Sequence, residues 1–199
     1  MTAARPMGPT ATRFERVDGV DSVALLAALR GLAGVIDAVV TDRHVLLSHA
    51  TRACPLDDLE PVLRGLMPPR AGAHHRFEVV YDGADLSEVA TLAGLSIGDV
   101  IARHASGSYR VELMGFQVGF AYLGGLDPRL HLPRRGSPRP RVPAQSVAIA
   151  GARTAVYPFA SPGGWHLLGR LDAGRLFDAL GAPLLKPGDT VSFTVAGAP

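Results

Sequence analysis

Cysteine and lysine are almost absent from this 199-residue sequence, and long apolar runs are missing. The single cysteine, Cys54, cannot form an internal disulfide, which favours a reducing compartment. Residues 1–12 lack the roughly 7–15-residue apolar core of a signal peptide, and every later apolar run ends well before membrane length. We therefore expect a cytoplasmic protein whose first dozen residues form a disordered tail.

Several catalytic motifs are also missing. No two glycines have the G-x-G spacing of a dinucleotide site, and the sole lysine, Lys186, precedes a proline, which excludes a Walker phosphate loop. The sequence contains no G-x-S-x-G elbow, and Cys54 has no glycine turn beside it. The seven histidines show no spacing that places two imidazoles on one helix face. We expect no metal, no covalent catalysis and no ordinary nucleotide fold from this chain alone.

Charge is distributed unevenly along the chain. Residues 1–112 hold 11 arginines against 14 carboxylates, whereas residues 113–199 hold 9 basic against 4 acidic residues. The second half therefore favours an anion or an acidic surface as its partner. Nucleic acid is the less favoured partner, because no helix-turn-helix or zinc-finger spacing occurs and no aromatics are interleaved with the arginines.

The first half of the chain shows helix and strand signals in alternation. Asp21 begins a helical stretch, two β-branched runs at 34–41 and 44–49 predict a hairpin, 56–66 predicts a helix, and 77–83 predicts a strand. With a weak first strand at 14–17, this order predicts a ferredoxin-like domain over residues 13–80.

The second half, residues 81–199, differs in its composition and in its pattern of predicted helices and strands. Two short helices are predicted next. Asp85 begins the first, with Glu88 three residues later as in a capping box, and Ser96 begins the second. From Tyr109 onward, short strands alternate with glycine and proline, and 10 of the 16 prolines lie beyond residue 112. Regularly spaced short strands predict a small barrel or sandwich, so the whole chain is expected to be an α+β protein.

Aromatic residues and glycines are interleaved in GFQVGFAYLGG, which begins at Gly115, and arginines and prolines are interleaved in PRRGSPRPRVP, which begins at Pro133. One interpretation is a pocket lined by aromatic rings and bare amides, beside guanidinium groups held on a stiff backbone that clamp a carboxylate or phosphate. The alternative is that the rings fill the barrel core and the arginine run is an exposed loop. The same choice applies to Trp165 in SPGGW, which lines a groove in one interpretation and plugs a barrel end in the other.

Taken together, these motifs, with YPFASPGGWHLLGR and PGDTVSF further on, resemble the allophanate hydrolase subunit 1 family, also called KipI or the B subunit of 5-oxoprolinase. The resemblance covers roughly residues 77–195. It implies a ferredoxin-like domain followed by a cyclophilin-like β-barrel. It also implies a homologous subunit 2 partner (KipA, or the C subunit of 5-oxoprolinase), a LamB/YcsF-type third subunit, and ATP with Mg shared with the partner.

The resemblance also implies a set of site residues. His104 is the candidate proton carrier, although an imidazole that satisfies a strand end is the more common case, and Arg134 and Arg139 are the candidate anion holders. The remaining substrate- or nucleotide-binding positions are Gly115, Phe116, Gly119, Phe120, Tyr122, Ser146, Ser161, Gly163, Gly164 and Trp165. The chain departs from the family pattern at Val118, where proline is usual, and at Gln145, where glycine is usual.

Three functions follow as expectations from this resemblance. The first is a subunit of an ATP-dependent 5-oxoprolinase, inactive alone, that acts on a small-molecule substrate with its subunit 2 partner. The second is a KipI-like inhibitor of a sensor histidine kinase. The third is the carboxyltransferase part of a urea or allophanate pathway enzyme. The arginine loop and glycine turns favour the first, because they suit a small anion better than a flat docking face.

Overall fold

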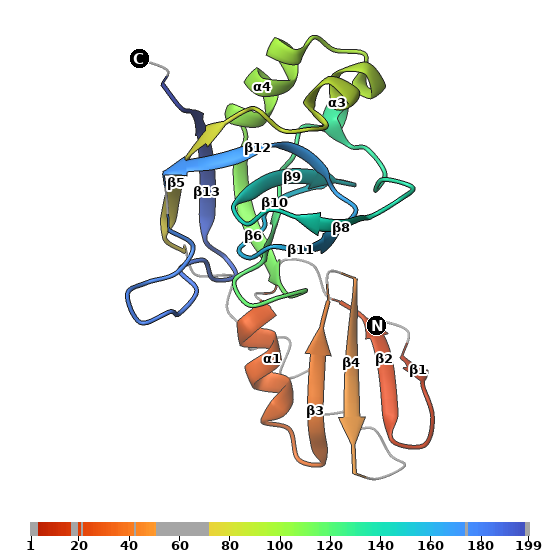
Figure 1. Ribbon diagram of the computed structural model, residues 1–199. Coiled ribbons are helices and arrows are strands. Elements are labelled where there is room, and N and C mark those ends of the chain that lie inside the picture. The colour runs from red at the N-terminus through yellow and green to blue at the C-terminus, as the bar shows by residue number, and fades with distance from the viewer. Residues whose placement is uncertain are drawn as a thin grey trace. The chain divides into compact units, whose positions relative to one another are not determined.

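The computed structural model divides the chain into two compact units, residues 1–71 and 72–199 (Figure 1). It describes residues 4–16, 20, 22–41, 43–50, 72–173 and 175–197. The helix predicted at 56–66 and Cys54 lie outside the described residues.

The N-terminal unit contains an antiparallel four-stranded sheet in the order β1-β2-β4-β3 and one described helix. Its elements are β1 (Arg5–Pro6), β2 (Ala11–Glu15), α1 (Ser22–Arg30), β3 (Val35–Val40) and β4 (His44–His49). The predicted helix and hairpin are therefore confirmed. The predicted disordered tail is wrong, because β1 and the start of β2 pair with each other within the first 13 residues.

The core of this unit lies between the sheet and α1. Phe14 of β2 and Val45 and Leu47 of β4 alternate with more exposed neighbours, and they pack with Leu25 and Leu29 of the helix. This period of two is expected of a sheet that is covered on one face. The second helix of a ferredoxin-like unit would fall outside the described residues, so that assignment stays a prediction.

The C-terminal unit is a closed seven-stranded barrel in the order β10-β7-β6-β13-β5-β12-β9. The barrel strands are β5 (His74–Val80), β6 (Ser108–Met114), β7 (Ala121–Gly124), β9 (Ser146–Ala150), β10 (Arg153–Val156), β12 (His166–Ala173) and β13 (Thr190–Val195). A separate two-stranded sheet joins β8 (Arg139–Val142) to β11 (Ser161–Gly163), and a short 3-10 helix spans Pro128–Leu130. The α+β class and the predicted barrel are confirmed.

Strand β5 belongs to the barrel, although the sequence pattern placed it last in the N-terminal domain. It pairs in parallel with β13, where Phe77 lies opposite Phe193, and antiparallel with β12. Its buried side chains, Phe77 and Val79, belong to the barrel core. The predicted boundary at residue 80 is therefore wrong, and the units divide between residues 71 and 72.

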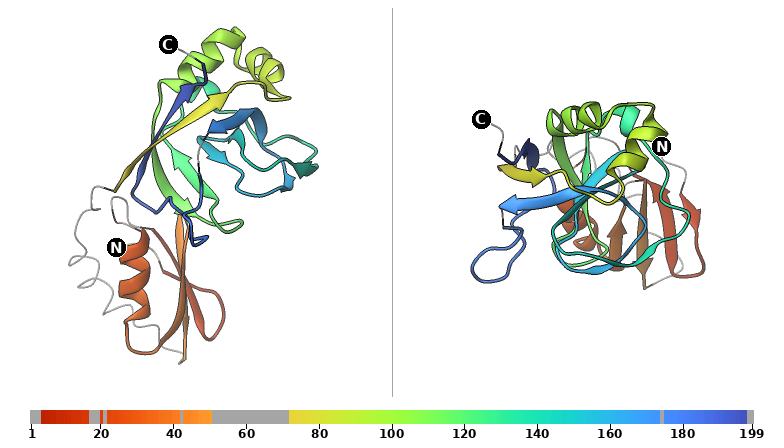
Figure 2. Two further views of the ribbon diagram at one scale, coloured as in Figure 1. Left: turned by 60° about the vertical axis from the view of Figure 1, so that its left-hand side comes forward. Right: turned by 45° about the horizontal axis from the view of Figure 1, so that its top comes forward.

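Helices α3 (Leu86–Ala93) and α4 (Ile97–Ala105) lie together beside the barrel (Figure 2). The predicted start of α4 is confirmed, because Ser96 accepts a hydrogen bond from the Asp99 backbone N–H at 3.0 Å and Asp99 reaches back to Ser96. This capping box satisfies amides that would otherwise lack partners at the helix start.

Candidate functional site

The aromatic side chains of the predicted pocket pack against one another inside the barrel unit. Phe120 is 1% exposed and Trp165 is 6% exposed. Their rings meet edge to face with centroids 5.7 Å apart, and Tyr122 lies 4.9 Å from Phe120. Tyr157 completes the group at 5.3 Å from Phe120. The expected open hollow beside Phe120 and Trp165 is therefore wrong for this structure, because edge-to-face packing of apolar rings excludes a ligand.

Phe116 differs from these rings because 60% of its surface is exposed. It contacts Phe120 with one side, and its backbone has a φ of 71°, in the left-handed region that side chains other than glycine rarely adopt. Residues held in strained backbone conformations cluster at functional sites. The strain at Phe116 is held by a tight loop, in which Gly115 N–H donates to Phe120 O at 3.1 Å and Gly119 has a φ of 79°.

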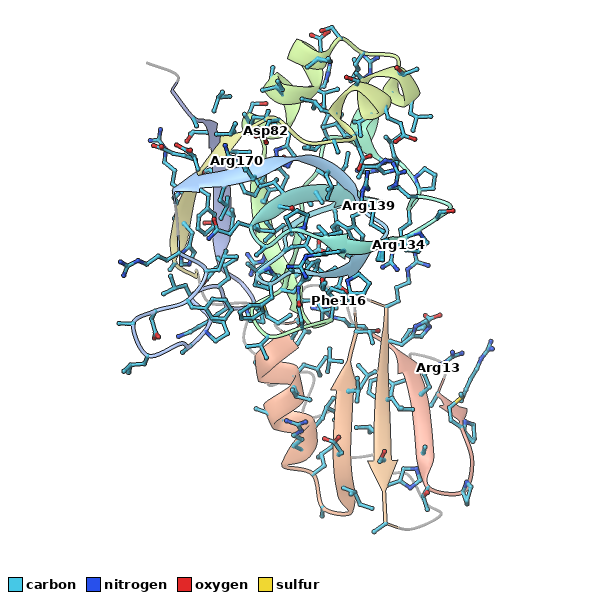
Figure 3. The ribbon with its side chains drawn as sticks, viewed as in Figure 1. Arg13, Asp82, Phe116, Arg134, Arg139 and Arg170 are labelled. Carbon is cyan, nitrogen blue, oxygen red and sulfur yellow. The ribbon has the colours of Figure 1, made fainter. Side chains whose placement is uncertain are left out.

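The arginine loop is anchored by a buried carboxylate, Asp85, whose side chain is 3% exposed. Asp85 accepts hydrogen bonds from Arg135 at 2.8 Å, from Arg139, and from the backbone N–H of Leu167 at 2.8 Å. Figure 3 shows where Arg139 lies in the C-terminal unit. Burial alone would raise the pKa of Asp85, but the bonds from Arg139 and Leu167 and the charges of both arginines outweigh it and lower the pKa. Asp85 is therefore an ionised structural anchor.

The capping box predicted for Asp85 and Glu88 is wrong, because both side chains bind arginines of the loop. Asp85 is the residue before α3, but its side chain makes no capping hydrogen bond. Glu88 accepts from Arg135 at 2.6 Å. Both carboxylates are oriented toward the arginine loop, because two guanidinium groups bind them more strongly than a helix terminus does.

The glycine turn of SPGGW supports the same loop. Gly164 O accepts from Arg135 N–H at 2.8 Å, and Gly163 lies opposite Arg139 in the β8–β11 pair. A Cβ at Gly163 would lie 2.3 Å from the Tyr157 hydroxyl oxygen, so the close approach requires glycine. The motif glycines thus position the arginines.

Some polar atoms of this region have no hydrogen-bond partner although they are buried. They are Arg135 Nε, Arg139 Nη1, Ser161 Oγ and His166 Nδ1. Buried polar groups are nearly always satisfied, so these atoms mark places where a ligand or water would bind. Arg134, in contrast, is exposed and makes no hydrogen bond or ion pair with any residue that the structure describes. Arg139 is held by Asp85 and keeps one unpartnered N–H group, whereas the side chain of Arg134 is exposed.

His104 lies in the barrel interior and is 0% exposed. Thr154 Oγ1 donates to Ala148 O at 3.0 Å, so it accepts from His104 Nε2–H at 2.9 Å, and His104 Nδ1 accepts from Tyr81 O–H at 2.7 Å. Burial lowers the pKa of His104 to about 3, which keeps the ring neutral. This geometry favours the structural alternative, because the imidazole has no contact with solvent through which to carry a proton.

Ser146 is also buried, and its hydroxyl donates to Pro143 O at 2.9 Å. It follows Gln145, which has a φ of 64°. The family pattern has glycine at position 145, and the positive φ gives the physical reason for that preference. Ser146 therefore closes a turn and is not directed at a ligand.

The sequence did not identify Asp85 and Glu88 as the carboxylates that pair with the arginine loop. They precede the arginine loop by about 50 residues, and their spacing favoured a capping box. The excess of arginine beyond residue 112 was the one signal that carboxylates from elsewhere would be needed.

The chain belongs to the carboxyltransferase domain, subdomain C and D family, whose model matches residues 9–184. Among the described residues, no helix has the length and apolar character needed to cross a membrane.

Its relatives include proteins named as the B subunit of 5-oxoprolinase. That of Haemophilus influenzae is 48% identical over 131 residues, which is 63% of this chain and 61% of the relative. That of Escherichia coli O157:H7 is 50% identical over 119 residues, which is 58% of this chain and 55% of the relative. The matched segments thus cover little more than half of these relatives.

Solved structures agree with the fold. TTHA0988 is 39% identical with a TM-score of 0.73, and the match covers 99% of this chain and 41% of that one. Urea amidolyase from Kluyveromyces lactis has a TM-score of 0.74 at 16% identity, covering 98% of this chain and 15% of that one, which shows the fold alone.

Proposed function

We propose that this chain is a subunit of an ATP-dependent 5-oxoprolinase and acts with a homologous subunit 2 partner. The observation that carries this proposal is the identity of about one half to relatives named as B subunits of 5-oxoprolinase. The matched segments leave much of those relatives uncovered, so activity, substrate and partner are all part of the proposal.

The substrate is a lactam with one carboxylate, and the exposed Arg134 is the cation best placed to hold it. A guanidinium binds a carboxylate or phosphate oxygen through charge-assisted hydrogen bonds. The unpartnered N–H groups of Arg135 and Arg139 lie in the same loop and provide further donors. Because Asp85 fixes both of these arginines, the loop keeps its shape when the ligand leaves.

ATP and Mg are shared with the partner subunit in this proposal. Transfer of the γ-phosphoryl group to the lactam oxygen would release ADP and make the amide carbon open to attack by water. The C–N bond would then break to give an acyl phosphate, and a second water would release phosphate and glutamate. This chain's residues bind and orient the substrate anion, and the partner or a LamB/YcsF-type third subunit completes the hydrolysis.

The exposed patch of Phe116, Val118 and Phe159 is the proposed contact with the partner. These side chains are 60%, 65% and 49% exposed, and Gln117 links the two loops by donating to Phe159 O at 3.5 Å. Exposed apolar patches commonly mark protein contacts, and an aromatic anchor is typical of their centres.

The test mixes the chain with its subunit 2 homologue and measures ATP hydrolysis with and without 5-oxoproline. We expect turnover stimulated by 5-oxoproline, a raised KM for this substrate in Arg134→Gln, and no change in Arg110→Gln, which alters an exposed arginine on β6. A folded pair of subunits that shows no stimulated hydrolysis would contradict the proposal.

Partner binding is tested separately with Phe116→Gly, which removes the ring but suits the positive φ. The matched control is Leu92→Ala, which removes a 57% exposed side chain from α3. We expect weaker complex formation for Phe116→Gly only, measured by calorimetry. Equal affinity for both variants would show that the partner binds elsewhere.

Carboxyl transfer in a urea or allophanate pathway is the second candidate, because the family model and the likeness to urea amidolyase fit it. It predicts a biotin-carrying partner. Binding of a biotinylated carrier domain without stimulation of ATP hydrolysis by 5-oxoproline would favour this candidate. The kinase-inhibitor role stays a prediction from the resemblance.

A further inference from the structure

Charged side chains lie on the β2 part of the N-terminal sheet, on the face away from α1. Thr12 and Phe14 of β2 are buried, so the alternate residues Arg13 and Glu15 point to the opposite face. In the β2–β4 pair, Glu15 lies opposite His44. These side chains therefore share the face that the described helix leaves uncovered.

Strand β1 adds a second arginine to this face. Arg5 lies directly opposite Arg13 in the antiparallel β1–β2 pair. Like charges at directly opposed positions destabilise a sheet. Neither guanidinium forms an ion pair with another residue in the described part of the chain. The two guanidinium groups therefore repel each other without a directly bonded counter-charge among the described residues.

The two arginines border a hollow in the surface of about 240 Å³. It is lined by Arg5, Arg13, Phe14, Glu15 and His44. Figure 3 shows Arg13 on β2, within the N-terminal unit. Pockets for drug-sized ligands are usually about 300–1,000 Å³, so this hollow suits a smaller molecule.

We propose that this hollow is a binding site for a small oxyanion, carboxylate or phosphate, held between the guanidinium groups of Arg5 and Arg13. Two opposed guanidinium groups can donate to separate oxygens of one anion, which removes the repulsion between them. Glu15 lowers the net positive charge of the hollow, but the two arginines still outnumber this one carboxylate in its lining. This proposal is independent of the 5-oxoprolinase assignment, because none of its residues belongs to the barrel.

The experiment titrates the intact chain with inorganic phosphate and, separately, with acetate, and follows backbone amide shifts by NMR. We expect saturable shifts at Arg13, Glu15 and His44 at millimolar anion, with chloride as the salt control. Saturation by acetate alone, phosphate alone or both supports the site and identifies its ligand chemistry. No saturable shift in this strand pair with either anion would overturn the proposal.

Three variants locate the anion. Arg13→Gln should weaken binding by about tenfold or more, because one charge-assisted contact is lost. Glu15→Gln should tighten phosphate binding, because it removes a like charge. Arg110→Gln, in the barrel, is the matched control and should leave these shifts unchanged. Undiminished binding in Arg13→Gln, or unchanged phosphate affinity in Glu15→Gln, would place the anion elsewhere and refute the inference.

Discussion

The buried imidazole of His104 should make the barrel sensitive to acid. Its pKa is about 3 in the folded protein, because burial removes the ring from water, against 6.5 for a free imidazole. Between these values the unfolded chain binds a proton that the folded chain does not bind. The free energy of unfolding therefore falls as the pH falls from 6.5, by about 1.4 kcal/mol for each pH unit. At pH 4.5 the loss from this one residue amounts to about 2.7 kcal/mol.

Trp165 provides a specific assay for this loss. It is the sole tryptophan of the chain, and it lies in the barrel core at 6% exposure. Its fluorescence during urea denaturation thus reports the unfolding of the barrel and not that of the N-terminal unit. Measurements at several pH values between about 4.5 and about 7.5, on both sides of the pKa of a free imidazole, give the dependence directly.

Two variants distinguish burial of His104 from its hydrogen bond with Tyr81 as the cause of the pH dependence of stability. His104→Gln should lower stability at neutral pH and flatten the pH dependence, since the titrating group is gone. Tyr81→Phe removes the donor to Nδ1 but leaves the imidazole buried, so the steep dependence should persist. If His104→Gln unfolds with the same pH dependence as the unaltered protein, another group is responsible and the reasoning is refuted.

Three further substitutions test the packing of the barrel by the same fluorescence assay. Asp85→Asn should lower the free energy of unfolding by about 3–5 kcal/mol, because two arginines lose a buried counter-charge. Asp82→Asn, at an exposed ion pair, should lower it by less than about 1 kcal/mol. Equal losses would contradict the anchoring role of Asp85. Gln145→Gly should stabilise by up to about 1 kcal/mol, since it relieves a positive φ, and a loss of stability would show that the side chain compensates. Gly119→Ala should cost more than about 1 kcal/mol, through its φ of 79° and a Cβ contact at 2.6 Å, while Gly136→Ala, whose Cβ meets open space, should be neutral.

The structure confirms those helices and strands whose signal lies in a local pattern of the sequence. The β3–β4 hairpin, α4 and the run of barrel strands each carry their signal within a few residues, as caps, turns or alternation. Strand β5 was assigned to the wrong unit, because its partner β13 lies more than 100 residues further along the chain. Nothing within His74–Val80 itself distinguishes a last strand of one domain from a first strand of the next.

For the candidate site as well, the sequence predicts some features and not others. The sequence singled out Gly119 and Gly163 as motif glycines, and the structure gives a backbone reason for each: Gly119 has a φ of 79°, and a Cβ at Gly163 would lie 2.3 Å from the Tyr157 hydroxyl oxygen. The sequence could not show which aromatic rings face outward. Phe116 and Phe120 stand four residues apart in one motif, yet one is 60% exposed and the other 1% exposed. That difference arises from the turn geometry and from rings contributed by distant strands.

The position of the domain boundary changes what the charge pattern means. Counted over 113–199, the chain has five more basic than acidic residues, but the barrel unit of 72–199 has 12 basic and 10 acidic residues. Residues 72–112 add six carboxylates but only three arginines, and Asp85 and Glu88 among these carboxylates neutralise arginines of the loop. The attraction for an external anion therefore rests on few exposed side chains, of which Arg134 is the best placed. A loop whose inner arginines are neutralised and whose outer arginine is free can hold its shape without ligand and still bind one.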